Sequence, residues 1–263
     1  MDILSEIVAN KRKEVEASKE LYPVKLLEKS MYFDGKPVSL IKYLKRKDKS
    51  GIIAEIKRKS PSKGVINAHV SVERTSIGYM QAGASGLSVL TDKDYFGGSP
   101  EDLKVARSFN FCPILRKDFM IDEYQVIEAK SFGADVILLI AAVLDKKEIE
   151  KLGKLAQGLG MEVLLEVHNE EELQRSITDK IDLIGVNNRN LKTFETNVQT
   201  SLDLGNKIPS DFVKVSESGL ADPKIIKELK KEGFEGFLMG ETFMKNGRPE
   251  KAAKEFIKQL VIE

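Results

Sequence analysis

From residue 52 onward, short apolar runs alternate with longer stretches in which apolar and charged residues follow helical spacing. Most of the runs are apolar at successive positions, which is typical of parallel strands covered on both faces. The predicted strands span residues 52–57, 86–91, 113–117, 135–140, 162–167, 183–188, 212–217 and 236–240. Eight strands alternating with helices predict an α/β protein, the closed (β/α)8 TIM barrel.

The predicted helices begin and end at recognisable residues. Four amphipathic stretches end at a glycine, which permits the left-handed turn that closes a helix. These glycines are Gly83, Gly133, Gly160 and Gly233. Asp122, Asp145 and Asp222 precede three of the helices, as N-caps do. The alternative fold, an open doubly wound sheet, favours a Gly-x-Gly-x-x-Gly turn after its first strand, and the chain has none there.

Residues 1–48 precede the repeat and are predicted to form a helical extension of one barrel domain that spans residues 1–263. One face of its first helix is apolar. That face consists of Ile3, Leu4, Ile7, Val8 and Val15. We expect the extension to cap one mouth of the barrel. The alternative is that it also shapes the substrate site.

Composition excludes several classes of protein. The net charge is +1, from 42 basic and 41 acidic residues, which argues against a general nucleic-acid-binding protein. There is no apolar run of about 18 residues and no apolar leader, so we expect no membrane span and a cytoplasmic location. Cys112 is the single cysteine and is expected to be a small buried residue. The two histidines, His69 and His168, lack zinc-site spacing, and no metal is expected.

Five predicted strands change from apolar to polar where they end. The residues at these ends are Glu55, Lys57, Lys117, Glu166, Asn187, Arg189, Glu217 and Ser218. Residues two apart share a face of a strand, so the charges continue the inward face, where an unpaired charge is costly. Active sites of such barrels lie at these strand ends. The pattern predicts a polar catalytic ring, with a purely structural ion network as the alternative.

Two further features indicate a phosphorylated, flat substrate. Gly219 and Gly240 follow the seventh and eighth strands, where barrels often bind phosphate through backbone N–H groups. Ser60 in the first loop adds a hydroxyl donor. Phe96 and Phe119 stand in the loops after the second and third strands and could hold an aromatic ring. Leu138 and Leu191 are candidates for the same wall, although each apolar residue could equally be core and each glycine an ordinary turn residue.

Six segments, taken in order, resemble the successive strand-end motifs of indole-3-glycerol phosphate synthase. They are AEIKRKSPSKG, LTDKDYFGGS, LRKDF, LLEVH, GVNNRNL and SESG. The resemblance covers nearly the whole chain, including the N-terminal extension. It implies a lyase of tryptophan biosynthesis whose substrate is an aromatic amino-sugar phosphate, 1-(2-carboxyphenylamino)-1-deoxyribulose 5-phosphate. The ring closes with loss of carbon dioxide and water, and no metal or organic cofactor takes part.

The resemblance also implies roles for the ring. Lys117 is the general acid that protonates the ketone oxygen, and we predict that neighbouring cations lower its pKa. Glu166, Lys57 and Glu55 share the dehydration step in a division that the sequence leaves open. The remaining matched polar positions are Asn187, Arg189, Glu217 and Ser218. Asn187 and Glu217 orient hydroxyls and lysines, and Arg189 binds the carboxylate or steadies the ring.

Two alternative functions remain at this point. The first is a sugar-phosphate isomerase like phosphoribosylanthranilate isomerase, whose family uses a Cys and an Asp at strand ends. Cys112 precedes its strand, and the first strand ends in Glu and Lys. The second is a non-catalytic phosphate-binding barrel, which would be expected to have lost charges from the ring. We expect a monomer.

Overall fold

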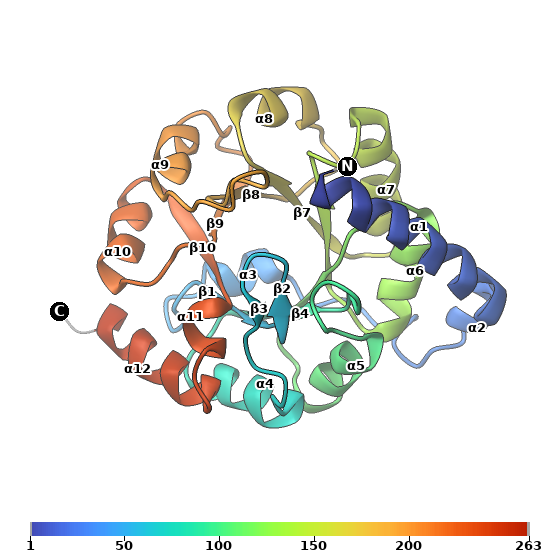
Figure 1. The fold of residues 1–263 in the computed structure, drawn as a ribbon, viewed down its shortest axis with the longest axis horizontal. Coiled ribbons are helices and arrows are strands. Elements are labelled where there is room, and N and C mark those ends of the chain that lie inside the picture. The colour runs from blue at the N-terminus through green and yellow to red at the C-terminus, as the bar shows by residue number, and fades with distance from the viewer. Residues whose placement is uncertain (1, 262–263) are drawn as a thin grey trace.

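Eight parallel strands close into a barrel in the computed structural model, which describes residues 2–261 (Figure 1). Each strand pairs with its neighbours along the chain, and β10 closes the ring against β1. The strands are β1 (Ile52–Ile56), β4 (Gly86–Leu90), β5 (Ile114–Lys117), β6 (Val136–Ile140), β7 (Glu162–Val167), β8 (Leu183–Asn187), β9 (Val213–Glu217) and β10 (Phe234–Met239). The predicted barrel is therefore confirmed. The largest boundary difference is in β10, which begins at Phe234 because that residue already pairs with Lys214 of β9 across a bulge.

Helices surround the barrel, one after each strand (Figure 1). They are α4 (Val72–Gln81), α5 (Pro100–Phe109), α6 (Glu123–Phe132), α7 (Lys146–Gly158), α8 (Glu170–Ser176), α9 (Gln199–Gly205), α10 (Pro223–Lys231) and α12 (Pro249–Val261), with the short α11 (Glu241–Met244) directly after β10. The predicted caps are confirmed: Asp122, Asp145 and Asp222 each accept a backbone N–H of the first turn. The four predicted helix-ending glycines all have positive φ.

The strands alternate between two apolar layers. Outward-facing residues pack against the helices, and inward-facing residues such as Ile53, Leu115, Leu164 and Val215 fill the barrel. The next inward position along each of these four strands carries a charge instead of an apolar group. The packed interior of the barrel therefore ends in a charged layer at the carboxyl ends of the strands, as the period of two requires.

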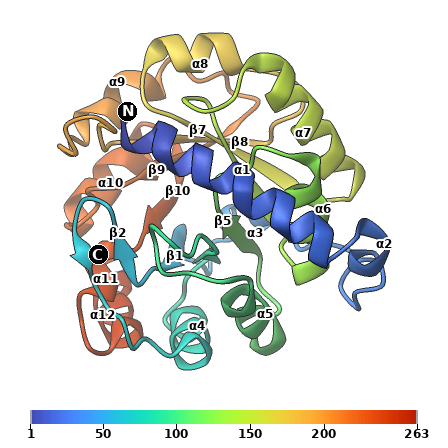
Figure 2. The same ribbon diagram turned by 45° about the vertical axis from the view of Figure 1, so that its right-hand side comes forward.

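The N-terminal extension reaches both ends of the barrel. Its helix α1 (Ile3–Leu21) crosses the mouth at the carboxyl ends of the strands and continues toward α6 and α2 (Val24–Leu27) (Figure 2). Helix α3 (Leu40–Leu44) closes the opposite end, where Leu40 and Leu44 join the inner core. The carboxylate of Glu162 accepts the backbone N–H groups of Leu40 and Ile41 at 2.8 and 3.1 Å, which fixes the start of α3.

A smaller sequence prediction concerns the single cysteine. Cys112 is buried in the outer core, as predicted, and burial raises the pKa of its thiol to about 12. None of the helices in residues 2–261 combines the length and the apolar character that a membrane crossing needs.

Candidate active site

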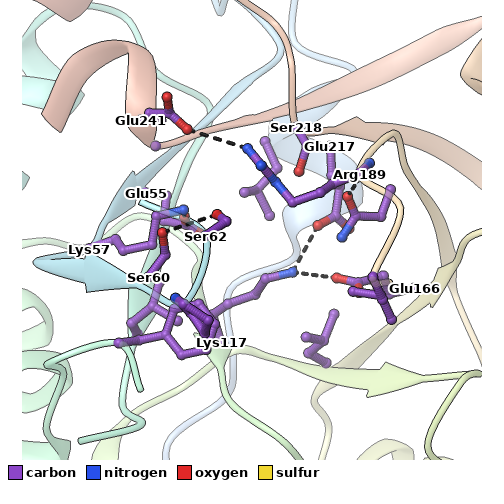
Figure 3. A pocket seen from close by; sticks show the side chains of 18 of the residues that line it. Glu55, Lys57, Ser60, Ser62, Lys117, Glu166, Arg189, Glu217, Ser218 and Glu241 are labelled. Atoms are coloured by element: carbon purple, nitrogen blue, oxygen red, sulfur yellow. Dashed lines mark hydrogen bonds and ion pairs between the residues drawn. The ribbon is translucent and has the colours of Figure 1, made fainter. Parts of the chain in front are cut away.

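A pocket opens at the carboxyl ends of the strands (Figure 3). Ile3, Leu4 and Ile7 of α1 line it, so the extension does shape the site. Every residue that the sequence predicted for the site lies in its wall. These residues are Glu55, Lys57, Ser60, Phe96, Lys117, Phe119, Leu138, Glu166, Asn187, Arg189, Leu191, Glu217, Ser218, Gly219 and Gly240. The structure thus brings all of them together, and their individual roles stay predictions.

Lys117 is the centre of the charged layer. Its ammonium donates hydrogen bonds to Glu166 Oε2 at 2.7 Å and to Glu217 Oε2 at 2.8 Å (Figure 3). A second pair lies beside it, with Lys57 Nζ 2.7 Å from Glu55 Oε1. Asn187 occupies the position of β8 that pairs with Glu217 of β9. The floor of the pocket therefore holds two lysines and three carboxylates in alternation.

The prediction that the pKa of Lys117 is lowered was wrong. Burial does oppose its charge, but the carboxylates of Glu166, Glu217 and Glu55 outweigh burial and raise the pKa above its ordinary value. The other lysine of the ring, Lys57, is itself paired with Glu55. Lys117 is therefore protonated, and its ammonium is stabilised by the carboxylates around it.

Glu166 and Glu217 share Lys117 but differ in their affinity for a proton. Burial raises the pKa of Glu217 to about 7, since Lys117 only partly offsets burial and the negative charges of Glu166 and Glu55. Burial acts on Glu166 in the same direction, but Lys117 and His168 together bring its pKa below the ordinary value. Two carboxyl groups whose pKa values are driven apart can hold one proton between them. Glu166 is the ionised member of the pair.

An aromatic wall faces this floor. The rings of Phe96 and Phe119 lie 6.0 Å apart between centroids and are tilted by 40°. Leu138 and Leu191 complete the wall together with the α1 residues. The hairpin of β2 (Lys59–Ser60) and β3 (Gly64–Val65) adjoins this wall, because the Lys59 N–H donates to the Phe96 carbonyl at 3.2 Å, and the Ser60 hydroxyl lies 3.4 Å from that of Ser62. The pocket can therefore hold a flat apolar group next to a rim of hydroxyl groups.

The turns after β9 and β10 form the third side. Ser218 and Gly219 both have left-handed backbone, with φ of 69° and 74°, and Asn188 Nδ2 donates to the Ser218 carbonyl at 3.0 Å. A non-glycine residue in this region is strained and needs such support. Gly240 directly precedes α11, and a side chain there would collide with the Glu55 carboxylate. The two turns expose backbone at the position where barrels of this kind bind phosphate.

Arg189 and Glu241 close the rim above these turns. Arg189 Nη2 lies 3.3 Å from Glu241 Oε2 (Figure 3). Lys63 Nζ lies 3.5 Å from Glu241 Oε1. Sequence reasoning missed Glu241, because a carboxylate is not expected beside a phosphate site. Its two cationic partners are the groups that an incoming phosphate would attract.

Comparison with known proteins decides the family. The family model described as indole-3-glycerol phosphate synthase matches residues 4–256. The chain belongs to this family. A protein of that name from Bacteroides thetaiotaomicron is 49% identical over 98% of this chain and 99% of its own length. Another from Carboxydothermus hydrogenoformans is 42% identical over 95% of this chain and 97% of its own length.

Solved structures with little sequence similarity share the fold. A 3-hexulose-6-phosphate synthase from Salmonella typhimurium superimposes with a TM-score of 0.64 at 11% identity, over 80% of this chain and 98% of its own. At that identity the likeness shows the barrel alone. The shared barrel therefore does not explain the ring of charges at its mouth, whose ion pairs must be explained from this chain's own residues.

His168 lies behind the pocket wall, in contact with Glu166, and sequence reasoning missed it. Its Nδ1 lies 3.0 Å from Glu172 Oε2, and its Nε2 lies 3.3 Å from Glu166 Oε1 on the side away from Lys117. The sequence pattern of the two histidines was considered only for zinc-site spacing. The available signal was its spacing, because a residue two positions after Glu166 continues the same face of β7.

The charge of His168 depends on pH in a predictable direction. Burial opposes its charge, but Glu166 and Glu172 outweigh burial and raise the pKa to about 9 from 6.5. Because the pKa of His168 is higher in the folded protein, its charged form stabilises the fold fully at pH values below the unfolded-state pKa of about 6.5. That contribution is lost as the pH rises through the folded-state pKa of about 9. At neutral pH, His168 is therefore a second cation that holds Glu166 ionised.

We expect the His168→Gln substitution to cost stability in a pH-dependent way. The loss in the free energy of unfolding should be largest below about pH 6.5, at most about 3 kcal/mol, and should shrink between pH 6.5 and 9. Urea denaturation across that range measures it. His69→Gln, at an exposed histidine, is the control and should change stability equally at every pH. A pH-independent loss for His168→Gln would contradict the assigned charge.

Proposed function

We propose that the chain converts 1-(2-carboxyphenylamino)-1-deoxyribulose 5-phosphate to indole-3-glycerol phosphate, carbon dioxide and water. One observation supports this most directly: a protonated lysine, Lys117, sits between two carboxylates on the floor of a pocket that has an aromatic wall and a phosphate-type rim. Membership of the family supports the same reaction. A phosphate bound at the turns after β9 and β10 would leave the carboxyphenyl ring against Phe96 and Phe119.

Ring closure needs an acid above all. The aromatic carbon that bears the carboxylate attacks the C2 ketone, and negative charge develops on the ketone oxygen. Lys117 gives that oxygen a proton, and Glu166 and Glu217 hold the ammonium in place meanwhile. The C–C bond to the carboxylate then breaks, carbon dioxide leaves, and the bonding electrons restore the aromatic ring.

Loss of water needs an acid and a base on the same intermediate. Lys57 is paired with Glu55, so it can protonate the leaving hydroxyl and regain a proton through that carboxylate. Glu166 is the carboxylate whose pKa is lowered, which makes it the ionised group and hence the base that takes a proton from C1, the carbon bonded to the amine nitrogen. The C1–C2 double bond of the indole then forms as water leaves C2, and the ring keeps its N–H. Asn187 and Glu217 orient the sugar hydroxyls, and Arg189 meets an anionic group of the substrate at the rim.

Product fluorescence tests the proposal directly. The chain contains no Trp, so indole formation from the carboxyphenylamino-deoxyribulose phosphate would be seen against a quiet background. We expect indole fluorescence to grow without added metal and in the presence of a chelator. Folded protein that binds the substrate without forming indole would favour a non-catalytic barrel. Folded protein that does not bind it would overturn the proposed substrate.

The isomerase alternative finds little support in the pocket. Its family needs a cysteine at a strand end, whereas Cys112 lies in the outer core and burial raises its pKa to about 12. A thiol held in the neutral form away from the pocket is a poor acid–base group at neutral pH. A cytoplasmic location, a monomeric state and the absence of nucleic-acid partners stay predictions.

A further inference from the structure

Lys11 of α1 is a buried lysine outside the charged ring. Its exposed fraction is 3%, and its ammonium lies 2.9 Å from Asp92 Oδ2, 3.0 Å from Asp118 Oδ1 and 2.6 Å from Glu14 Oε2. Burial opposes the charge, but the aspartates outweigh burial and raise its pKa. A buried ammonium with three carboxylates around it is costly to assemble, so its position calls for an explanation.

Both aspartates organise loops that form the aromatic wall. Asp92 follows β4, and its Oδ1 accepts the N–H groups of Tyr95 at 2.8 Å and Phe96 at 3.2 Å. Asp118 follows Lys117, and its Oδ1 accepts the N–H group of Phe119 at 2.8 Å. One oxygen of each aspartate thus shapes its own loop, and each aspartate also faces the ammonium of Lys11.

The contacts around Asp118 extend this connection. Its Oδ2 accepts the Thr91 hydroxyl at 2.5 Å and Arg116 Nη2 at 3.2 Å, so Asp118 is fixed to the end of β4 as well. Lys11, Arg116 and Thr91 help hold the pKa of Asp118 down at about 2 although burial opposes this. Ion pairs with Lys11 and the hydrogen bond from Thr91 to Asp118 therefore connect the loops after β4 and β5 on the side that faces α1.

We propose that Lys11 is a positioning residue that sets the separation and tilt of Phe96 and Phe119 for the aromatic ring of the substrate. That the wall holds an aromatic ring of the substrate rests on the proposed function. That Lys11 positions the wall rests on the contacts described above. Without the ammonium, Asp92 and Asp118 would repel each other across the gap it fills. The loops would then move apart, and the ring contact between the two phenylalanines at 6.0 Å would loosen.

The competing explanation is that Lys11 only attaches α1 to the barrel. Lys19 does that further along the same helix, where its ammonium lies 2.9 Å from Asp122, the N-cap of α6, and 2.9 Å from Glu16. Glu6 and Asn10 add hydrogen bonds from α1 to Tyr95 and Asp94. Lys19→Met is therefore a matched control: it removes an ion pair of α1 from the same helix and leaves the contacts of Asp92 and Asp118 in place.

Kinetics separate the two explanations. We expect Lys11→Met to raise KM about tenfold, the factor given by 1.4 kcal/mol of lost binding, with kcat reduced by no more than about threefold. Lys11→Arg keeps the charge and should restore KM to within about threefold of the original value. Lys19→Met should lower the melting temperature without raising KM. Lys11→Met with an unchanged KM would overturn the proposal.

Hydrogen exchange tests the positioning without any turnover. Amides in residues 92–97 and 118–121 should exchange faster in Lys11→Met than in the unchanged protein or in Lys19→Met. Unchanged exchange in both segments would overturn the proposal even if the enzyme proved inactive. If the unchanged protein forms no indole, the proposed function fails while this measurement still decides the role of Lys11.

If Lys11→Met does not fold, a second variant allows the same KM test. Lys11→Met combined with Asp92→Asn removes one charge of each sign, and the amide oxygen of Asn can still accept the N–H groups of Tyr95 and Phe96. We expect this double variant to fold and to keep part of the rise in KM, because the repulsion between the two aspartates is gone but the ammonium that links the two loops is still absent. A folded double variant with normal KM would overturn the proposal.

Discussion

Lys117→Met should reduce the rate of indole formation by a factor of roughly 10³, the middle of the range for loss of a general acid. Methionine has a similar length but no proton to give, so the oxyanion of ring closure forms unassisted. Binding should change much less, because the phosphate turns and the aromatic wall remain. Single-turnover fluorescence measures the rate. An analogue with the ketone reduced to an alcohol measures binding without reaction.

Two control variants separate proton transfer from charge. Lys117→Arg keeps a cation between Glu166 and Glu217, but a guanidinium does not release its proton. We expect the Arg variant to be as inactive as the Met variant and more stable, since Met leaves two buried carboxylates without their cation. Substantial activity in Lys117→Arg would favour a structural or purely electrostatic ion network. Near-normal turnover in folded Lys117→Met would refute the acid role altogether.

The strand-end residues could be predicted because two simple rules combine. Alternation within a strand assigns Glu55 to the same face as Ile53, and closure of a parallel barrel brings the carboxyl ends of all strands to one mouth. Both rules use local sequence and the number of strands. They were sufficient to place Glu55, Lys117, Glu166 and Glu217 in the wall of the pocket without knowledge of a single long-range contact.

The same rules do not tell which charges meet. Lys117 donates to carboxylates that are 49 and 100 residues away in sequence, and only the closed barrel decides that these surround it rather than Lys57. The predicted direction of the pKa shift of Lys117 was wrong for that reason. Lys11 was equally hidden, because a lysine among the charges of an amphipathic helix has the pattern of a solvated residue although its partners lie in distant loops.

In the Glu166→Gln variant, carbon dioxide should be released before the indole product forms. Glutamine keeps the shape and one hydrogen-bond acceptor toward Lys117, so ring closure and decarboxylation should still proceed. It cannot take up the C1 proton, so water loss should slow by a factor of roughly 10² to 10³. We expect one equivalent of carbon dioxide per enzyme to appear quickly, with indole fluorescence following at the slower rate.

Single-turnover measurements of both products give the answer. Glu241→Gln is the control for loss of a carboxylate from the pocket, because Glu241 contacts Arg189 and Lys63 rather than Lys117. In that variant carbon dioxide and indole should appear together. If Glu166→Gln instead delays both products equally, Glu166 acts at or before ring closure, through its hold on Lys117. Its lowered pKa would then serve to keep the lysine charged, and the base of the dehydration step would have to be sought at Glu55 or Glu217.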